Sequence, residues 1–594
     1  MKNILKALSY SFVQMLEDRK INVLHLVLEI VRRVGIAICM MFFPQRIVRE
    51  LIEKNFMHGL GVALLFCICI LIGEVFLSYV ETKRKEMEAR LNVQENIKLS
   101  AAIMRTSYEQ TEQKTYLEKV DFAKACIERK SVAKICSEII EAVAGVISLS
   151  GAFFIVFRLP PFLLLFMFLA VVLSAIGEIF RLRYTYDRYE KGQDIERNLY
   201  YARNDLAENR YAKDIRIWNL YCYISKKVEK YAGKLCALWS ETSIKSVKVV
   251  GWTYAANGLQ YAVVYAFLAW MTYRNAITID EFVLYASTVA IWGDSLKDVL
   301  NAVIGIGDEF KYIEGIRSII DGGAKAEEVC EQAVVFRDKI ELKHIWFRYQ
   351  GATEYVFRDL NLTIEKGKKY SVVGVNGAGK TTFVKLLLGL YHPEKGEILI
   401  DGKAVKNCNE EGYRRNFSCV FQDYHIYGFS VRENIAFQEN NLDKIEQAMK
   451  RAGIKEKVEM LPKKEDTLMN REINDDATVF SGGQEQQLAL ARALYKDAGI
   501  YILDEPTAAL SPSMEIAVYQ QCYEELKEKT VIFISHRLAS CVLSDEIIVL
   551  DDGRVSERGT HEKLVSEGGL YADMFRLQAE AYIKNEEQED EENL

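Results

Sequence analysis

Apolar residues fall in long blocks through the first half of the chain. Six blocks have close to the ~20 residues that a helix needs to cross a bilayer: Asn22–Phe43, Met57–Val80, Ser137–Phe157, Phe162–Phe180, Val249–Tyr273 and Glu281–Ile306. The first block is the weakest, because Glu29, Arg32 and Arg33 interrupt it. The pattern predicts six membrane-spanning helices in a lipid bilayer.

The polar connections between the blocks indicate how these spans are oriented. Thr82–Lys134 and Arg181–Lys248 are long and rich in Lys and Arg, whereas the other connections are short. Because Lys and Arg accumulate on the cytoplasmic side, we expect both long segments and both termini in the cytosol of a multi-pass protein of the cytoplasmic membrane. Their apolar residues keep a helical period, so we expect the helices to continue well beyond the membrane. Met1–Lys20 has the mixed pattern of a cytosolic or interfacial helix.

Two places within the long segments have features of contact elements. Tyr108–Ala123 combines aromatic and acidic residues, and Asn209–Leu220 sets Ile215, Ile217 and Trp218 among basic neighbours. Taken alone, each pattern fits an ordinary helix packed on its neighbour at least as well. A cytosolic domain that docks there would favour the contact interpretation.

The pattern changes after the sixth block. Ile316–Glu331 is polar and contains Gly322 and Gly323, which predicts a linker. Beyond it, short strand-like runs such as Ile340–Tyr349 and Tyr355–Ile364 alternate with helical patterns, as in an α/β domain. We predict a six-helix transmembrane domain at 1–315, a linker at 316–335, a nucleotide-binding domain at 336–580 and a disordered acidic tail at 581–594.

The clearest chemical signal lies in Lys369–Leu390, where a short β-rich run, a glycine loop and a helix follow one another. The loop fits the pattern G-x-x-x-x-G-K-[ST], whose backbone N–H groups cradle a phosphate chain. Lys380 can reach the β- and γ-phosphates, and the Thr381 hydroxyl can bind Mg²⁺. The candidate binding residues are Gly374, Asn376, Gly377, Ala378, Gly379, Lys380, Thr381 and Thr382.

A second signal is the apolar run Ile500–Leu503, which ends in Asp504 and Glu505. A carboxylate at a strand end opposite a phosphate loop holds Mg²⁺, and the next one is placed to polarise an attacking water. On its own this run would be a buried strand with a solvated acidic end. Its pairing with the phosphate loop favours Asp504 as a metal ligand and Glu505 as a catalytic group.

A third signal is Phe480–Gln484, which precedes the predicted helix Glu485–Leu494. Ser481 and the backbone amides of Gly482 and Gly483 at a helix start make an anion site, and Gln484 is a further candidate binding residue. Because the chain already has a phosphate loop, this anion site makes sense if it caps a nucleotide held by another subunit. Standing alone, the same residues would be an ordinary turn before a helix.

The order of these motifs resembles that of the ATP-binding-cassette (ABC) ATPases, and six spans before the cassette make the chain similar to an ABC exporter half-transporter. The resemblance implies a phosphate-loop α/β cassette with a helical subdomain. It implies that Tyr349 stacks on adenine, that Gln422 contacts Mg²⁺ and faces the membrane domain, that Glu505 is the general base and that His536 holds the γ-phosphate. The segments around Tyr108–Ala123 and Arg210–Leu220 would correspond to the family's two coupling helices.

The same resemblance implies ATP-driven export of a substrate by alternating access, with ATP and Mg²⁺ as the bound species. Each ATP would lie between Gly374–Thr382 of one chain and Ser481–Gln484 of a second half-transporter chain. We expect a homodimer, with a heterodimer as the alternative. The substrate is left open among peptides, drugs and lipids. Rival classes are a cassette ATPase that does not transport, an importer, and a membrane protein regulated by nucleotide.

Two stretches depart from the family pattern. Ala508–Ser511 reads A-A-L-S where the family usually has S-A-L-D, and Glu472–Val479 lacks the usual G-E-x-G element. The first change puts communication between the two sites in doubt. The second is compatible with a subfamily near the lantibiotic and peptide exporters. Phe480 replaces the usual Leu, which keeps the position apolar.

Composition adds few constraints. The net charge of −7 gives no reason to expect a nucleic-acid partner. The 12 Cys are scattered, without a C-x-x-C pair or metal-ligand spacing, which is typical of reduced packing cysteines. The N-terminus lacks the pattern of a removable signal peptide.

Overall fold

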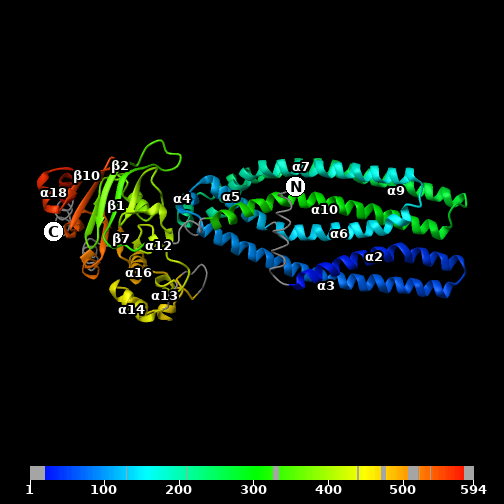
Figure 1. Ribbon diagram of the computed structural model, residues 1–594, viewed down its shortest axis with the longest axis horizontal. Coiled ribbons are helices and arrows are strands. Elements are labelled where there is room, and N and C mark those ends of the chain that lie inside the picture. Colours follow the sequence, from blue (N-terminus) through cyan, green and yellow to red (C-terminus); the bar gives the residue numbers. More distant parts are fainter. Residues whose placement is uncertain are drawn as a thin grey trace. The chain divides into compact units, whose positions relative to one another are not determined.

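The computed structural model describes residues 20–128, 130–208, 211–325, 334–437, 441–469, 476–505, 519–520, 522–535 and 537–580. Contacts divide the chain into two units. The helical unit comprises Met1–Met104 and Leu117–Gly323, and the cassette unit comprises Arg105–Tyr116 and Ala324–Leu594. Long helices build the first unit, whereas the second contains sheets flanked by shorter helices (Figure 1).

The apolar blocks of the sequence all lie within helices. The helices of this part of the chain are α2 (Lys20–Ile52), α3 (Phe56–Arg105), α4 (Tyr108–Thr111), α5 (Lys114–Glu128), α6 (Ser131–Val156), α7 (Pro161–Arg203), the 3₁₀ turn η1 (Asp205–Ala207), α8 (Ala212–Ile217), α9 (Tyr221–Tyr273) and α10 (Ile279–Lys325). Helices α3, α7 and α9 are 50, 43 and 53 residues long. The predicted helical extensions beyond the spans are therefore confirmed.

Three of the described helices are long and apolar enough to cross a bilayer: α3, α6 and the Pro161–Thr185 part of α7. For α2, α9 and α10 the membrane span stays a prediction. The interruption in α2 has a local explanation, because the Glu29 carboxylate accepts bonds from Arg32 at 2.9 Å and from Arg33 at 2.9 Å. Glu29 is only 7% exposed, so these pairs offset the cost of burying its charge.

Apolar packing and close helix approaches hold the helical unit together. Leu163 and Met167 of α7 pack with Val264 and Leu268 of α9, and these two helices run side by side (Figure 1). A Cβ at Gly145 of α6 would lie 2.7 Å from a methyl carbon of the Val299 side chain, so only glycine permits this approach to α10.

The predicted start of the linker at residue 316 is wrong. Helix α10 continues through this stretch to Lys325, with Ile316 and Ile319 buried. Gly322 and Gly323 are tolerated inside it, at the usual cost of about 1 kcal/mol each relative to alanine. Most of Met1–Lys20 and all of the acidic tail 581–594 lie outside the described residues.

The cassette unit contains two sheets. Their strands are β1 (Lys339–Phe347), β2 (Phe357–Glu365), β3 (Lys369–Val373), β4 (Lys395–Ile400), β5 (Lys403–Ala404), β6 (Phe417–Val420), β7 (Ile500–Asp504), β8 (Thr530–Ile534), β9 (Glu546–Asp551) and β10 (Arg554–Gly559). The four-stranded antiparallel sheet has the order β2-β1-β4-β5, and the six-stranded sheet has the order β10-β9-β3-β8-β7-β6. In the latter, β3, β6, β7, β8 and β9 are parallel, so their C-terminal ends meet at one edge.

Helices and turns complete the cassette unit. They are α11 (Lys380–Leu387), η3 (Val405–Asn407), α12 (Glu410–Arg414), α13 (Val431–Ile435), α14 (Leu442–Arg451), α15 (Lys455–Glu459), η4 (Lys464–Asp466), α16 (Gly482–Tyr495), η5 (Leu538–Leu543) and α18 (His561–Glu567). Ile445, Val458 and Leu488 bring α14, α15 and α16 into one apolar cluster. This cluster forms the helical subdomain. In the six-stranded sheet, β3, β7 and β8 are buried along their whole length, as is usual for strands of parallel sheets.

Candidate nucleotide-binding site

A cleft of about 330 Å³ opens at the edge where the parallel strands end. It is lined by Tyr349, Val356, Asn376, Gly377, Gly379, Lys380, Thr381, Thr382, Gln422, Asp504, Glu505 and Ile534. The fold therefore gathers the phosphate loop, the two carboxylates, Gln422 and Tyr349 at one place. These residues come from segments that are widely separated in the sequence.

The backbone of the phosphate loop depends on its glycines. At Gly374 an added Cβ would lie 2.3 Å from the carbonyl oxygen of Leu550, so no other residue fits. Gly379 begins α11 with φ of +96°, where its added Cβ would meet the Phe357 ring at 2.9 Å. The ammonium of Lys380 donates to the carbonyl oxygens of Gly374 at 2.8 Å and Val375 at 3.3 Å. These contacts hold the lysine over the loop.

The carboxylates of Asp504 and Glu505 form the acidic side of the cleft. Asp504 is 2% exposed, and burial raises its pKa to about 6, with further increases from the charges of Glu505 and Asp423 and an opposing effect of Lys380. Burial lowers the pKa of Lys380, which the two carboxylates partly offset. The site thus carries more negative charge than its one lysine neutralises.

The excess of negative charge in the cleft bears on whether its residues fit Mg²⁺. The Thr381 hydroxyl and the Asp504 carboxylate line the same cleft and are hard oxygen ligands of the kind that Mg²⁺ prefers. A divalent cation beside Asp504 would remove the electrostatic cost that raises its pKa. The donor set and its charge therefore fit Mg²⁺. Among the described residues, no group of three or more His, Cys, Asp or Glu side chains forms a separate metal site.

Tyr349 reaches the cleft from the end of β1. Its hydroxyl forms a 2.8 Å hydrogen bond with the hydroxyl of Thr382, and its ring meets Phe347 and Tyr391 edge to face. These contacts hold the Tyr349 ring in place where the residue lines the cleft. The position is suited to stacking with a planar base.

The Ser481–Gln484 segment begins α16 and is absent from the lining of this cleft. Ser481 and Gln484 form a capping box, in which the Ser481 N–H donates to the Gln484 side chain at 3.0 Å. Ser481 and Gly482 are exposed. The predicted anion site is therefore a true helix start, but it does not meet the phosphate loop of its own chain.

Comparison with known proteins gives the context of this site. Residues 357–508 match the ABC transporter family. A solved bacterial Atm1-family ABC exporter with ATP bound matches with a TM-score of 0.79 and 22% identity, covering 94% of this chain and 98% of the other. Residues 357–508 are therefore an ABC transporter domain, and the chain has the fold of this ABC exporter. Its apolar helical unit and its cassette are fused in one membrane protein.

Curated relatives align over shorter stretches. The subtilin transport ATP-binding protein SpaT of Bacillus subtilis is 28% identical over 402 residues, which is 66% of this chain and 64% of the relative. The ATP-dependent lipid A-core flippase of Vibrio cholerae serotype O1 is 37% identical over 243 residues, which is 40% of this chain and 41% of the relative. The alignments thus span less than two thirds of each relative's own length.

Some predicted site residues lie outside the part of the chain that the structure describes. His536, the Ala508–Ser511 segment and the first part of Glu472–Val479 lie outside the described residues. Gly374 and Ala378 support the loop without lining the cleft.

Other residues of the site were missed by the sequence analysis. Val356 and Ile534 line the cleft, and the signal that could have found Ile534 is its place at the end of a buried parallel strand.

The predicted contact segment Tyr108–Ala123 divides into two parts. Its first part, α4, belongs to the cassette unit, where Tyr108 packs against the apolar core and against the Tyr391 ring. Its second part belongs to the helical unit, where the Phe122 ring stacks on Tyr312. The contact interpretation is therefore confirmed for Tyr108.

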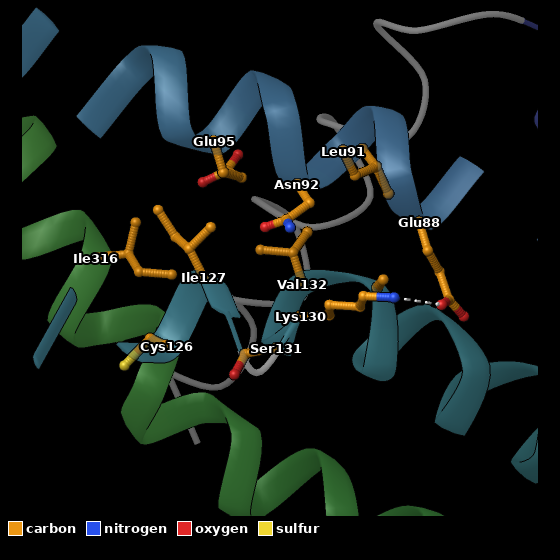
Figure 2. A pocket seen from close by; sticks show the side chains of 11 residues that line it. Glu88, Leu91, Asn92, Glu95, Cys126, Ile127, Lys130, Ser131, Val132 and Ile316 are labelled. Carbon is orange, nitrogen blue, oxygen red and sulfur yellow. Dashed lines mark ion pairs between the residues drawn. The ribbon is translucent and has the colours of Figure 1, made fainter. Parts of the chain in front are cut away.

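The helical unit contains a second, much smaller pocket of about 10 Å³ (Figure 2). Figure 2 shows Asn92 and Glu88 approaching it from α3, while Lys130, Ser131 and Val132 approach from the junction of α5 and α6. The Lys130 ammonium lies 3.6 Å from the Glu88 carboxylate. The residues that line this pocket belong to the helical unit, whereas the phosphate loop belongs to the cassette unit.

Proposed function

We propose that this chain is one half of an ATP-driven exporter in the cytoplasmic membrane, with its cassette in the cytosol. One observation carries the proposal: the phosphate loop, Gln422, Asp504 and Glu505 line a single cleft in a chain that also has long apolar helices. A protein that only senses nucleotide does not need a carboxylate such as Glu505 at this position.

We assign each residue of the cleft a separate role in ATP hydrolysis. The loop amides and Lys380 bind the phosphates, and Tyr349 packs on the base. Glu505 accepts a proton from the attacking water, while Gln422 orients the Glu505 carboxylate through a 2.9 Å hydrogen bond. Thr381, Asp504 and Gln422 would hold Mg²⁺, which when bound would supply positive charge to the phosphate oxygens. We assign His536 to the γ-phosphate on the resemblance alone.

A second chain is needed to complete the site. Ser481 and Gly482 are exposed at the start of α16 and do not line the cleft of their own chain. We infer that they cap the nucleotide of a partner cassette, so that ATP draws two cassettes together and hydrolysis releases them. A homodimer is the simplest assembly, and the changed Ala508–Ser511 segment keeps a heterodimer as the alternative.

The segment around α8 supports a contact with another cytosolic surface. Ile217 and Trp218 are 76% and 71% exposed in a region that the charge pattern assigns to the cytosol. Exposed apolar side chains of this size favour a docking role over a free surface. We assign α8 as the second coupling element.

Two relatives of different kinds support the candidates for the substrate class. One has subtilin transport in its name and the other is a lipid A-core flippase. We take a peptide as the first candidate, because the first of these alignments covers more of this chain, and a lipid or drug as the second.

The test uses the purified full chain in nanodiscs and proteoliposomes. We expect Mg·ATP hydrolysis that disappears in Lys380→Ala and Glu505→Gln variants, and ATP-dependent movement of a candidate peptide or lipid. Binding of ATP without hydrolysis in the unmodified chain would instead identify a nucleotide-regulated membrane protein. Hydrolysis that persists unchanged in Glu505→Gln would contradict the assigned role of this carboxylate.

A further inference from the structure

Tyr391, in the turn that follows α11, lies between Tyr349 of the nucleotide cleft and Tyr108 of α4, and it is 3% exposed. Its ring centroid lies 5.4 Å from that of Tyr349 with an interplanar angle of 90°. On its other side, the ring centroid of Tyr108 in α4 is 5.6 Å away at 86°. Both pairs have the edge-to-face geometry that aromatic rings prefer. Tyr391 thus joins a residue of the cleft to a residue of α4 by two directional contacts.

The hydroxyl of Tyr391 extends this connection to a charged group. It donates a hydrogen bond to the carboxylate of Glu112, the residue that caps the C-terminus of α4. The Lys385 ammonium lies 3.6 Å from the same carboxylate and sits over the rings of Tyr108 and Tyr391 at 5.2 and 5.6 Å. The Lys385 ammonium therefore interacts both with the Glu112 carboxylate at the end of α4 and with the two tyrosine rings.

The charge states of these groups suit the arrangement. Burial alone would raise the pKa of Glu112, but hydrogen bonds from Tyr391 and Tyr108 and the charge of Lys385 lower it below its usual value. Burial and the neighbouring Glu112 raise the pKa of Tyr391. At neutral pH the carboxylate is ionised and the phenol is a neutral donor, which makes this hydrogen bond charge-assisted.

At the cleft, the contacts of Tyr391 lead through Tyr349 to Thr382 of the phosphate loop. The Tyr349 hydroxyl is bonded to Thr382, which is 5% exposed and follows Thr381 in the phosphate loop. Tyr391 contacts the Tyr349 ring from the side, so its removal would leave that ring free to tilt. A base that packs on Tyr349 needs this orientation.

We propose that Tyr391 is a positioning residue that orients Tyr349 for the base of the nucleotide and transmits its occupancy to α4 through Glu112. This inference rests on the proposed function, because it requires a nucleotide in the cleft. It concerns the base side of the nucleotide and is separate from the contact between Gln422 and Glu505 at the phosphate side. A role in core packing alone would give different results in the experiment below.

The experiment compares four variants of the full chain in nanodiscs. Tyr391→Leu removes the ring, Tyr391→Phe removes only the hydroxyl, and Glu112→Gln removes the charge that the hydroxyl contacts. Glu109→Gln is the matched control, because it makes the same charge change in the same helix without a bond to Tyr391. The readouts are the KM and kcat for Mg·ATP, inhibition by Mg·tripolyphosphate, and amide hydrogen exchange of residues 108–112 with and without a non-hydrolysable ATP analogue.

For Tyr391→Leu, we expect the KM for ATP to rise about two- to tenfold, the range for one lost aromatic pair, with kcat unchanged. Inhibition by tripolyphosphate, which has no base, should stay as in the unmodified chain. A general loss of structure would weaken both ligands alike. Equal weakening of ATP and tripolyphosphate would therefore overturn the positioning role.

For Tyr391→Phe and Glu112→Gln, we expect a KM within about twofold of the unmodified chain, since the rings remain. The slowing of hydrogen exchange in residues 108–112 on nucleotide binding should disappear in both variants and persist in Glu109→Gln. If Tyr391→Phe, Glu112→Gln and Glu109→Gln all keep this slowing of hydrogen exchange, the inference fails while the proposed function stands. If the unmodified chain itself neither hydrolyses ATP nor binds the analogue, the proposed function fails and the inference with it.

Discussion

The side-chain amide of Gln422 donates a 2.9 Å hydrogen bond to the carboxylate of Glu505, although 83 residues separate them. The two residues follow neighbouring parallel strands, β6 and β7, in which Val420 pairs with Leu503. Because parallel strands bring their C-terminal ends to one edge, this pairing sets the distance between the two side chains. Gln422 thereby holds one carboxylate oxygen of Glu505 in place.

Glu505→Gln should lower ATP turnover by about 100-fold or more, because a general base contributes 10²–10⁴ to the rate. Nucleotide binding should survive, since the phosphate loop is unchanged and glutamine keeps the size of the side chain. Phosphate release and binding of a fluorescent ATP analogue measure the two effects separately. The variant Glu485→Gln, at the start of α16, is the control for loss of a negative charge elsewhere.

Gly374→Ala should abolish nucleotide binding, because the new Cβ would lie 2.3 Å from the carbonyl oxygen of Leu550. The loop or β9 must shift to relieve this contact, and the amides then no longer converge on the phosphates. Gly351→Ala is the matched control: Gly351 has φ of +83° but open space around its Cβ position. The control should cost only about 1 kcal/mol of backbone strain and leave ATP binding intact. Equal ATP affinity in the two variants would contradict this account of the loop.

The residues of the phosphate loop were predictable because they are contiguous and each has a local chemical reason. The helical blocks were predictable for a similar reason, since a period of 3.6 residues is visible in any short window. By contrast, the contact of Tyr391 with Glu112 joins positions 279 residues apart, and neither residue belongs to a motif. Only the fold brings them together.

The misplaced linker has a different cause. The last turns of α10 carry Asp321, Gly322 and Gly323, a composition that favours a loop on propensity alone. Ile313, Ile316 and Ile319 are buried nonetheless, and their packing outweighs the helix cost of the two glycines. Tertiary burial of this kind cannot be deduced from a polar stretch without knowing what lies beside it.

Asp401 gives a prediction about pH. Its carboxylate accepts bonds from the backbone N–H groups of Arg337, Asp338 and Lys339 at 2.7, 2.9 and 2.9 Å. Burial alone would raise the pKa of Asp401, but these three donors lower it below its ordinary value of 3.8. The ionised form therefore stabilises the folded state above that pH, and the contribution is lost as the pH falls below it through the lowered pKa.

Asp401→Asn should accordingly lower the free energy of unfolding by about 1–2 kcal/mol at neutral pH. The difference in melting temperature between the variant and the unmodified chain should be constant from about pH 8 to 5 and shrink below about pH 4. Thermal unfolding of the detergent-solubilised chain at several pH values measures this. Asp551→Asn is the control, because this residue lies at the exposed end of β9, and the substitution should have little effect on stability. A difference that grows as the pH falls would contradict the assigned role.

Ser131→Ala should leave the stability unchanged or raise it by up to about 1 kcal/mol. Ser131 is fully buried at the pocket of Figure 2, and among the described residues its hydroxyl has no hydrogen-bond partner. Alanine removes a polar group that lost its water on folding without gaining a bond.

Ser174→Ala is the contrasting variant, because the Ser174 hydroxyl donates to Asn257 of the neighbouring helix at 3.2 Å, and its loss should be destabilising. Melting temperatures of the two variants in the same detergent give the comparison. A clear drop for Ser131→Ala would mean that the hydroxyl is satisfied by an internal water molecule shared with Asn92, whose side-chain oxygen is also buried there without a partner among the described residues.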